Sequence, residues 1–316
     1  MVRAEEGAPS GDDRKHELIM FILIMHRKVI IPALTIFFIC HAAVTSADSW
    51  TNRISVTVRG HGPGIVLIPG LTCSSAVWDA TAAHLEGHYR LLLIQVNGFA
   101  GTQAQANSDG PVVQPTVDAI DVCIKAHKLK APKVIGHSLG GTMGMMLALQ
   151  HPEDVGSLMI VDSLPFSGVM FGANDLASAK KIGAELRDQT IKESESEYAR
   201  GEKKFLRILV KSPNGRELAT QWAVASDKSV VARATYDDMT TDLGPQLQNI
   251  KIPVTVVYPW DAKSPYSQAQ TDWFYQQNYA ALPNKTFARI DNSYHFIMLD
   301  QPDAFLAQVD KFVGPP

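Results

Sequence analysis

The 316-residue chain is 46% hydrophobic and 19% charged, a balance that excludes a disordered protein. It is long enough for one large α/β domain or for a core domain with an insertion. The 29 lysines and arginines are nearly matched by 32 aspartates and glutamates, which gives a net charge of -3. The chain lacks the excess of basic residues that would indicate nucleic acid or an anionic membrane as a partner. We therefore expect a small, fairly neutral molecule as the partner.

The first fifty residues have the layout of a secretory signal. A basic stretch at 25–28 precedes an apolar run at 29–40, and small residues follow up to Ala47. We expect residues 1–47 to be an N-terminal extension and signal peptide, cut after Ala47, with export to the periplasm or the medium. The acidic lead before Met25 favours a translation start at Met25. A retained membrane anchor is the alternative, but the apolar run is about a dozen residues against the roughly 20 needed to span.

From residue 53 onward, short apolar runs alternate with helical periodicity. The pattern predicts an α/β fold with a mostly parallel sheet of about eight strands flanked by helices. The core domain would comprise residues 48–164 and 250–316. The glycines at 60, 62 and 64 precede a strand, so they do not predict a dinucleotide site, and no cofactor or metal is expected. The segments with strand character are 54–58, 64–68, 90–96, 133–136, 158–161, 254–258 and 286–290.

Residues 132–150 predict a strand, a sharp turn and a helix, with Ser138 at the turn. The turn reads Gly-His-Ser-Leu-Gly, the G-x-S-x-G pattern of a nucleophile elbow. A strained serine backbone requires neighbours without side chains, which Gly136 and Gly140 provide. A glycine-rich loop with a capping serine is the plain alternative. We predict Ser138 as a nucleophile.

The composition changes over residues 165–249, which are rich in charged residues and contain no convincing strand. Apolar residues recur there at helical spacing, so we predict a helical cap or lid over one edge of the sheet. The charges are interpreted as solvated helix faces.

A serine hydroxyl needs a base and a carboxylate that orients the base. His295 follows the predicted strand 286–290, and loops at the carboxyl ends of parallel strands face the site. Asp261 follows the strand before it and gives the chain order Ser, Asp, His. Asp162, which follows the strand 158–161, stays open as the alternative carboxylate.

The oxyanion formed on the substrate needs backbone N–H donors. Leu139 follows Ser138 and offers one such group. Leu71 follows Gly70 at the end of the strand 64–68 and offers the second. Two cysteines would stay in the exported chain, and we expect both Cys73 and Cys123 to be free buried thiols rather than a bridge.

These motifs resemble those of the α/β-hydrolase-fold serine enzymes, from about residue 54 to 313. Members similar to this chain carry His-Gly before the oxyanion residue, whereas this chain carries Pro69-Gly70. The resemblance implies a catalytic triad and an oxyanion hole. It fixes the fold better than the substrate.

We therefore expect hydrolysis of small, fairly apolar carboxylic esters through an acyl-enzyme. Lactone, amide, thioester or carbon–carbon bond hydrolysis and perhydrolysis stay open on the same triad. A receptor of the same fold that scarcely turns over is the non-enzyme alternative. Five residues are candidate pocket lining, with core packing as the alternative for each: Met143, Phe166, Met170, Phe171 and Trp222. The sequence does not indicate an oligomeric state or a stable membrane span in the exported chain.

Overall fold

The computed structural model describes residues 50–315, and these build one seven-stranded sheet in the order β1-β3-β2-β4-β5-β6-β7. β1 runs antiparallel to β3, and every other neighbouring pair is parallel. The seven segments predicted as strands are all confirmed, whereas the expected count of about eight is not confirmed, because the described residues form seven. The strands are β1 (Ile54–Arg59), β2 (Gly64–Ile68), β3 (Arg90–Val96), β4 (Lys133–His137), β5 (Ser157–Val161), β6 (Val254–Trp260) and β7 (Lys285–Asp291).

Helices pack on both faces of the sheet, because strand residues alternate between two hydrophobic clusters. Val66 and Ile68 belong to one cluster, which includes α3 and α4, whereas Ile65 and Leu67 belong to the other, which includes α2 and α11. The helices of the core are α2 (Asp79–Leu85), α3 (Val113–Ala126), α4 (Leu139–Gln150), α9 (Gln268–Asn278), α10 (Ile297–Asp300) and α11 (Pro302–Val313).

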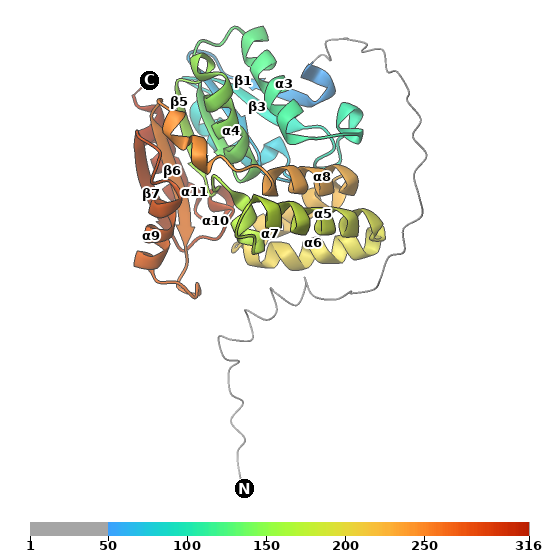
Figure 1. The fold of residues 1–316 in the computed structure, drawn as a ribbon. Helices are drawn as coiled ribbons and strands as arrows, with labels where there is room; N and C mark the ends of the chain where they lie inside the picture. Colours follow the sequence, from blue (N-terminus) through green and yellow to red (C-terminus); the bar gives the residue numbers. More distant parts are fainter. Residues whose placement is uncertain (1–49, 316) are drawn as a thin grey trace. The chain divides into compact units, whose positions relative to one another are not determined.

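Four α-helices fill the segment between β5 and β6. Figure 1 shows α5 to α8 gathered beside the sheet, where α5 packs on α8 and α6 packs on α7. Asp175 and Ser194 begin two of them with capping boxes, in which side chain and backbone satisfy each other's hydrogen-bonding groups. We call this segment the helical insertion; its helices are α5 (Leu176–Lys192), α6 (Glu195–Leu209), α7 (Pro213–Ala225) and α8 (Lys228–Met239).

Short 3-10 turns complete the described chain. They are η1 (Trp50–Asn52), η2 (Ser75–Trp78), η3 (Gln105–Ser108), η4 (Pro152–Asp154), η5 (Ser167–Phe171) and η6 (Gly244–Asn249). None of the helices in residues 50–315 combines the length and apolar character that crossing a bilayer would need. The predicted signal peptide and its cut after Ala47 lie outside the described residues.

Both described cysteines are buried free thiols, as predicted for Cys73 and Cys123. Burial raises the pKa of Cys73 to about 12 and that of Cys123 to about 11. Because the thiolate is the reactive form, neither thiol is activated for nucleophilic chemistry.

The parallel strands bring distant parts of the sequence to one edge of the sheet. Loops at the carboxyl ends of β2, β4, β5, β6 and β7 share that edge. The residues that follow these strands are Gly70, Ser138, Asp162, Asp261 and His295, in that order. The candidate site is therefore assembled from five separate loops.

Candidate active site

Ser138 occupies a strained turn between β4 and α4. Its φ of 53° lies in a region that residues with side chains rarely adopt. Glycines make the turn possible: a Cβ at Gly136 would lie 2.1 Å from the Gly140 carbonyl oxygen, and one at Gly140 would lie 2.2 Å from the Ile68 carbonyl oxygen. The strand, sharp turn and helix predicted around Ser138 are therefore present. Such a turn holds a serine out from the sheet edge.

His295 lies in the loop after β7, and its ring is oriented by a carboxylate. Nδ1 of His295 is 2.7 Å from Oδ2 of Asp162, and the His295 side chain is 21% exposed. An ionised carboxylate can only accept a hydrogen bond, so Nδ1 of His295 carries the proton in this contact. Nε2 is then the nitrogen free to accept a proton from another group. His295 is thus held in the tautomer that a general base requires.

The loop of His295 is fastened to the turn of Ser138 by a second histidine. Nε2 of His137 donates to the carbonyl oxygen of His295 at 3.1 Å, and the two rings lie 4.6 Å apart. Burial lowers the pKa of His137 well below its usual range, and the neighbouring His295 adds to this effect. His137 is therefore a neutral donor that anchors the His295 backbone next to Ser138. Within residues 50–315, no hydrogen bond joins the Ser138 hydroxyl to His295, and such bonds are often long or misaligned before substrate binds.

Asp162 follows β5 directly and is constrained from two sides. Its φ is 45°, and its N–H donates to the Val257 carbonyl oxygen at 2.8 Å. The hydroxyl of Tyr275, on α9, donates to Oδ1 of Asp162, while Oδ2 faces His295. Burial and the adjacent carboxylate raise the pKa of Tyr275 well above its usual range, which keeps the phenol protonated as a donor. Sequence reasoning had no signal for Tyr275.

Asp261 is not the partner of His295, and the structure corrects this prediction. Asp261 follows β6 and is only 5% exposed, but its Oδ2 accepts from Nζ of Lys211 at 2.6 Å. Oδ1 accepts from the N–H of Lys263 at 2.9 Å. Burial alone would raise the pKa of Asp261, yet these donors outweigh it and hold the pKa below its usual value. Lys211 belongs to the helical insertion, so the spacing of residues along the core did not predict that Asp261 would pair with it.

The two predicted oxyanion donors flank Ser138. Leu139 begins α4, so its N–H belongs to the first turn and has no partner within the helix. Leu71 follows Gly70, where an added Cβ would lie 3.1 Å from Cβ of Ser138 and 2.9 Å from Nδ1 of His137. The β2 loop thus packs against Ser138 and His137 with little room for a side chain at Gly70. The oxyanion role of Leu71 and Leu139 stays a prediction.

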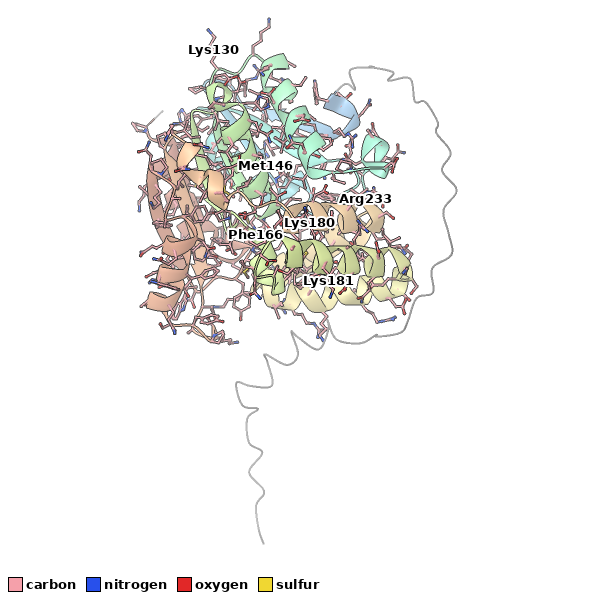
Figure 2. The ribbon with its side chains drawn as sticks, in the orientation of Figure 1. Lys130, Met146, Phe166, Lys180, Lys181 and Arg233 are labelled. Atoms are coloured by element: carbon pink, nitrogen blue, oxygen red, sulfur yellow. The ribbon has the colours of Figure 1, made fainter. Side chains whose placement is uncertain are left out.

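The five residues predicted to line an apolar pocket lie in different surroundings, and their role in binding stays a prediction. Met143 is 1% exposed in the cluster with α3 and α4, whereas Trp222 packs against the cluster on the opposite face of the sheet. Met170 is 62% exposed. Phe166 is half-buried where β5 leads into the insertion (Figure 2), and its backbone pairs with that of Asp242. Phe171 is also half-buried. Met143 and Trp222 pack against hydrophobic clusters of the core. Helical spacing predicts that such residues are covered, but it does not predict which elements cover them.

A carboxyl group of the insertion also lies at this edge of the sheet. Asp238 of α8 is close enough to His295 for their charges to interact, and it lies beside the hydroxyls of Thr142 and Ser167. Burial raises the pKa of Asp238, and those hydroxyls partly offset the effect. Both hydroxyls do so as hydrogen-bonding partners of the Asp238 carboxyl group. Asp238 and Ser167 were not predicted, because a charged helix was interpreted as a solvated face.

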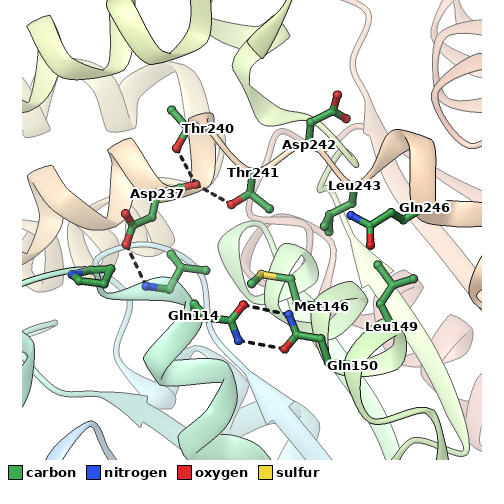
Figure 3. Close-up of a pocket in the computed structure, with 12 residues that line it drawn as sticks. Gln114, Met146, Leu149, Gln150, Asp237, Thr240, Thr241, Asp242, Leu243 and Gln246 are labelled. Atoms are coloured by element: carbon green, nitrogen blue, oxygen red, sulfur yellow. Dashed lines mark hydrogen bonds between the residues drawn. The ribbon is translucent and has the colours of Figure 1, made fainter. Parts of the chain in front are cut away.

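A separate pocket of about 360 Å³ lies between α3, α4 and the end of α8 (Figure 3). The amides of Gln114 and Gln150 bond each other there, and Asp237 accepts from the N–H groups of Val112 and Val113. Ser138, Asp162 and His295 are not among its lining residues. The pocket is therefore distinct from the candidate site. Its Gln114, Gln150 and Asp237 side chains already have hydrogen-bond partners within the protein.

One group of side chains in the described chain has metal-like spacing: Asp121, His151 and Asp154. Nζ of Lys125 lies 2.8 Å from Asp121 and 3.2 Å from Asp154. The lysine ammonium therefore already supplies the positive charge that these carboxylates need. The group is better explained as an ion-pair network on the α3–α4 side than as a metal centre.

Comparisons with known proteins identify the family and the fold. Residues 63–302 match the alpha/beta hydrolase fold family. The chain is 37% identical to the pimeloyl-(acyl-carrier protein) methyl ester esterase of Aeromonas salmonicida over 114 residues, which cover 35% of this chain and 42% of that protein. It is 24% identical to the enzyme of the same name from Aeromonas hydrophila, over 83% of this chain and 99% of that one.

A solved structure shares the same fold. The enol-lactonase from Burkholderia xenovorans superposes with a TM-score of 0.67 at 18% identity, covering 82% of this chain and 96% of that chain. A likeness at this identity concerns the fold rather than the reaction.

Proposed function

Since this chain belongs to the alpha/beta hydrolase fold family, we propose that it is a serine hydrolase that cleaves carboxylic esters. Ser138 is the nucleophile, His295 the general base and Asp162 the carboxylate that orients the base. The observation that carries the proposal is the 2.7 Å contact between Asp162 and His295, in a loop fastened to the strained turn of Ser138. Relatives named as methyl ester esterases support esters as the substrate class.

The first half of the reaction acylates the serine. His295 takes the hydroxyl proton as Ser138 Oγ bonds to the ester carbonyl carbon, and the carbonyl oxygen becomes an oxyanion. The N–H groups of Leu71 and Leu139 donate to that oxyanion. The bond to the alcohol oxygen then breaks, and His295 returns its proton to the departing alcohol. Asp162 stabilises the imidazolium that exists between these two transfers.

The second half releases the acid. Water enters in place of the alcohol, and His295 removes its proton as the water oxygen bonds to the acyl carbon. The second oxyanion collapses, the bond to Ser138 Oγ breaks and His295 protonates the serine. The enzyme returns to its starting state without a cofactor. An amide or lactone would pass through the same steps, so the fold of the enol-lactonase does not by itself favour a second reaction.

Two further features complete the proposal. The helical insertion would act as a cap over residues Ser138 and His295, as the position of Asp238 beside His295 suggests.

The N-terminal 47 residues would direct export and be cut after Ala47. N-terminal sequencing of the protein recovered from the medium or periplasm tests export. A chain retained inside the cell with its first residues intact would contradict it.

A panel of esters that vary in acyl and alcohol size tests the activity itself. We expect hydrolysis of short methyl esters by the wild-type chain and a loss of at least about a thousandfold in Ser138→Ala. Circular dichroism of the variant should match the wild type. Ester hydrolysis that survives in Ser138→Ala would refute the assignment of the nucleophile.

A further inference from the structure

The backbone around the proposed catalytic histidine is held at three consecutive residues by three different partners. The carbonyl oxygen of His295 accepts from the histidine of the nucleophile turn at 3.1 Å. The N–H of Tyr294 donates to Oδ2 of Asp300 at 2.9 Å. The N–H of Phe296 donates to the carbonyl oxygen of Leu209 at 3.2 Å. Because Leu209 is the last residue of α6, the helical insertion takes part in holding this loop.

Asp300 links the same loop to the insertion a second time. Its carboxylate also accepts from two backbone N–H groups at the junction between α6 and α7. The nitrogen of Lys211 lies 3.0 Å from Oδ1 and 3.1 Å from Oδ2, and the nitrogen of Ser212 lies 2.8 Å from Oδ1. Hydrogen bonds to an ionised carboxylate are stronger than those between neutral groups. We call the Asp300 carboxylate with the N–H groups of Lys211, Ser212 and Tyr294 the Asp300 clamp.

The clamp is built on a turn that the core holds in place. Asp300 is the last residue of α10, whose Ile297 and Met298 are buried in the hydrophobic cluster with α2 and α11. The N–H groups of Lys211 and Ser212 lie between two helices, so neither helix supplies them with a partner. The clamp satisfies both groups. It therefore fixes the α6–α7 junction and the loop after β7 against one buried turn.

We propose that Asp300 is a positioning residue for His295, and that it holds the base in place by fastening its loop to the helical insertion. This inference rests on the proposed ester hydrolysis. Asp300 acts through the backbone of Tyr294, whereas Asp162 orients the ring of His295 itself. A displacement of about 1 Å in a catalytic group can cost about a hundredfold in rate. The insertion thus contributes to catalysis through the base, in addition to its proposed role as a cap.

Steady-state kinetics of two substitutions test the positioning role. Asp300→Ala removes every acceptor of the clamp and should lower kcat on a methyl ester by about tenfold to a hundredfold, with KM within about threefold. Asp300→Asn keeps one acceptor oxygen, so its loss should be smaller. Asp303→Asn changes an exposed aspartate at the start of α11 and should leave kcat unchanged. Thermal unfolding shows whether each variant is folded at the assay temperature. A lower unfolding temperature with kcat unchanged in Asp300→Ala would overturn the proposal.

Two measurements need no turnover and so separate this inference from the proposed function. In hydrogen exchange followed by mass spectrometry, peptides over 209–213 and 293–297 should both exchange faster in Asp300→Ala, because one carboxylate protects amides in both. In the proton NMR spectrum, the Nδ1 proton of His295 should give a low-field signal that Asp162→Asn abolishes and Asp300→Ala weakens. Faster exchange in only one segment, or an unaltered signal, would overturn the clamp. Both changes without turnover of any ester by the wild type would support the clamp and refute the proposed function alone.

Discussion

Oδ2 of Asp162 lies 2.7 Å from Nδ1 of His295, although 133 positions separate them in the chain. Asp162 follows β5, the strand next to the one that carries Ser138. Asp261, which follows β6, instead binds Lys211. The carboxylate that orients the histidine therefore comes from the strand beside β4. We therefore expect activity to depend on Asp162 rather than on Asp261.

Replacing the two aspartates should separate catalysis from stability. Asp162→Asn removes the negative charge that stabilises imidazolium and favours the wrong histidine tautomer, so kcat should fall by about a thousandfold or more. Asp261→Asn should leave kcat within about threefold of the wild type. Steady-state kinetics on one methyl ester measures both. A larger loss for Asp261→Asn than for Asp162→Asn would contradict the assignment.

The stability effects should run in the opposite order. Asp261→Asn leaves Lys211 without its buried partner and should lower the free energy of unfolding by about 1–3 kcal/mol. Urea titration followed by circular dichroism measures this value. Lys211→Met is the matched variant, and combining it with Asp261→Asn should cost less than the sum of the two single changes. Strict additivity would show that the two side chains do not interact.

Tyr275 should act as a positioning residue through Asp162. Its hydroxyl donates to the carboxylate oxygen that does not face His295. Tyr275→Phe removes this donor, so Asp162 gains freedom and kcat should fall by about threefold to thirtyfold, with KM nearly unchanged. The acidic limb of the pH profile of kcat/KM should also move, which a loss of packing alone would not cause. An unchanged pH profile would argue against this role.

Most of the fold was predictable because buried parallel strands have a strong local signal. The seven apolar runs and the strand-turn-helix around Ser138 need only neighbouring residues to specify them, for example the close packing of Gly136 against Gly140. The placement of His295 followed from the rule that loops at the carboxyl ends of strands share one edge. The expected count of about eight strands was larger than the seven apolar segments identified in the sequence.

The errors concern contacts between elements far apart in the chain. Chain order favoured Asp261, but Lys211 from the helical insertion neutralises it. Helical spacing indicated that Met143 and Trp222 would be buried, yet it did not show that they pack on opposite faces of the sheet. Asp238 lay within a charged segment and carried no local sign of burial. Packing partners decide these cases, and a single sequence does not reveal them.

Gly70 should be intolerant of a side chain. A Cβ there would lie 3.1 Å from Cβ of Ser138 and 2.9 Å from Nδ1 of His137, and the ring of His137 is fully buried, so it has little room to move. Gly70→Ala should therefore reduce kcat by at least about tenfold, because it displaces either Ser138 or the β2 loop. Gly87→Ala is the matched control, since an added Cβ there meets no atom within 4 Å. Equal activity of the two variants would be inconsistent with the proposed close approach.

His137 should make the protein less stable in mild acid. Because burial lowers its pKa in the folded chain, the unfolded chain binds more protons below the ordinary histidine pKa of about 6.5. The free energy of unfolding should therefore be complete above pH 6.5 and should fall as the pH drops from 6.5 toward 5. One such group contributes up to about 1.4 kcal/mol per pH unit. In His137→Gln this contribution should vanish, and the slope between pH 7 and 5 should flatten; an unchanged slope would show that His137 is not buried as a neutral ring.

The central claim is that Ser138 is made nucleophilic by His295. Treatment with a fluorophosphonate, followed by intact mass and peptide mapping, tests it directly. We predict one adduct per chain, located on Ser138, formed at least about a hundredfold more slowly in His295→Ala. No adduct on the wild-type chain, or an adduct on another residue at the same rate in Ser138→Ala, would contradict the account.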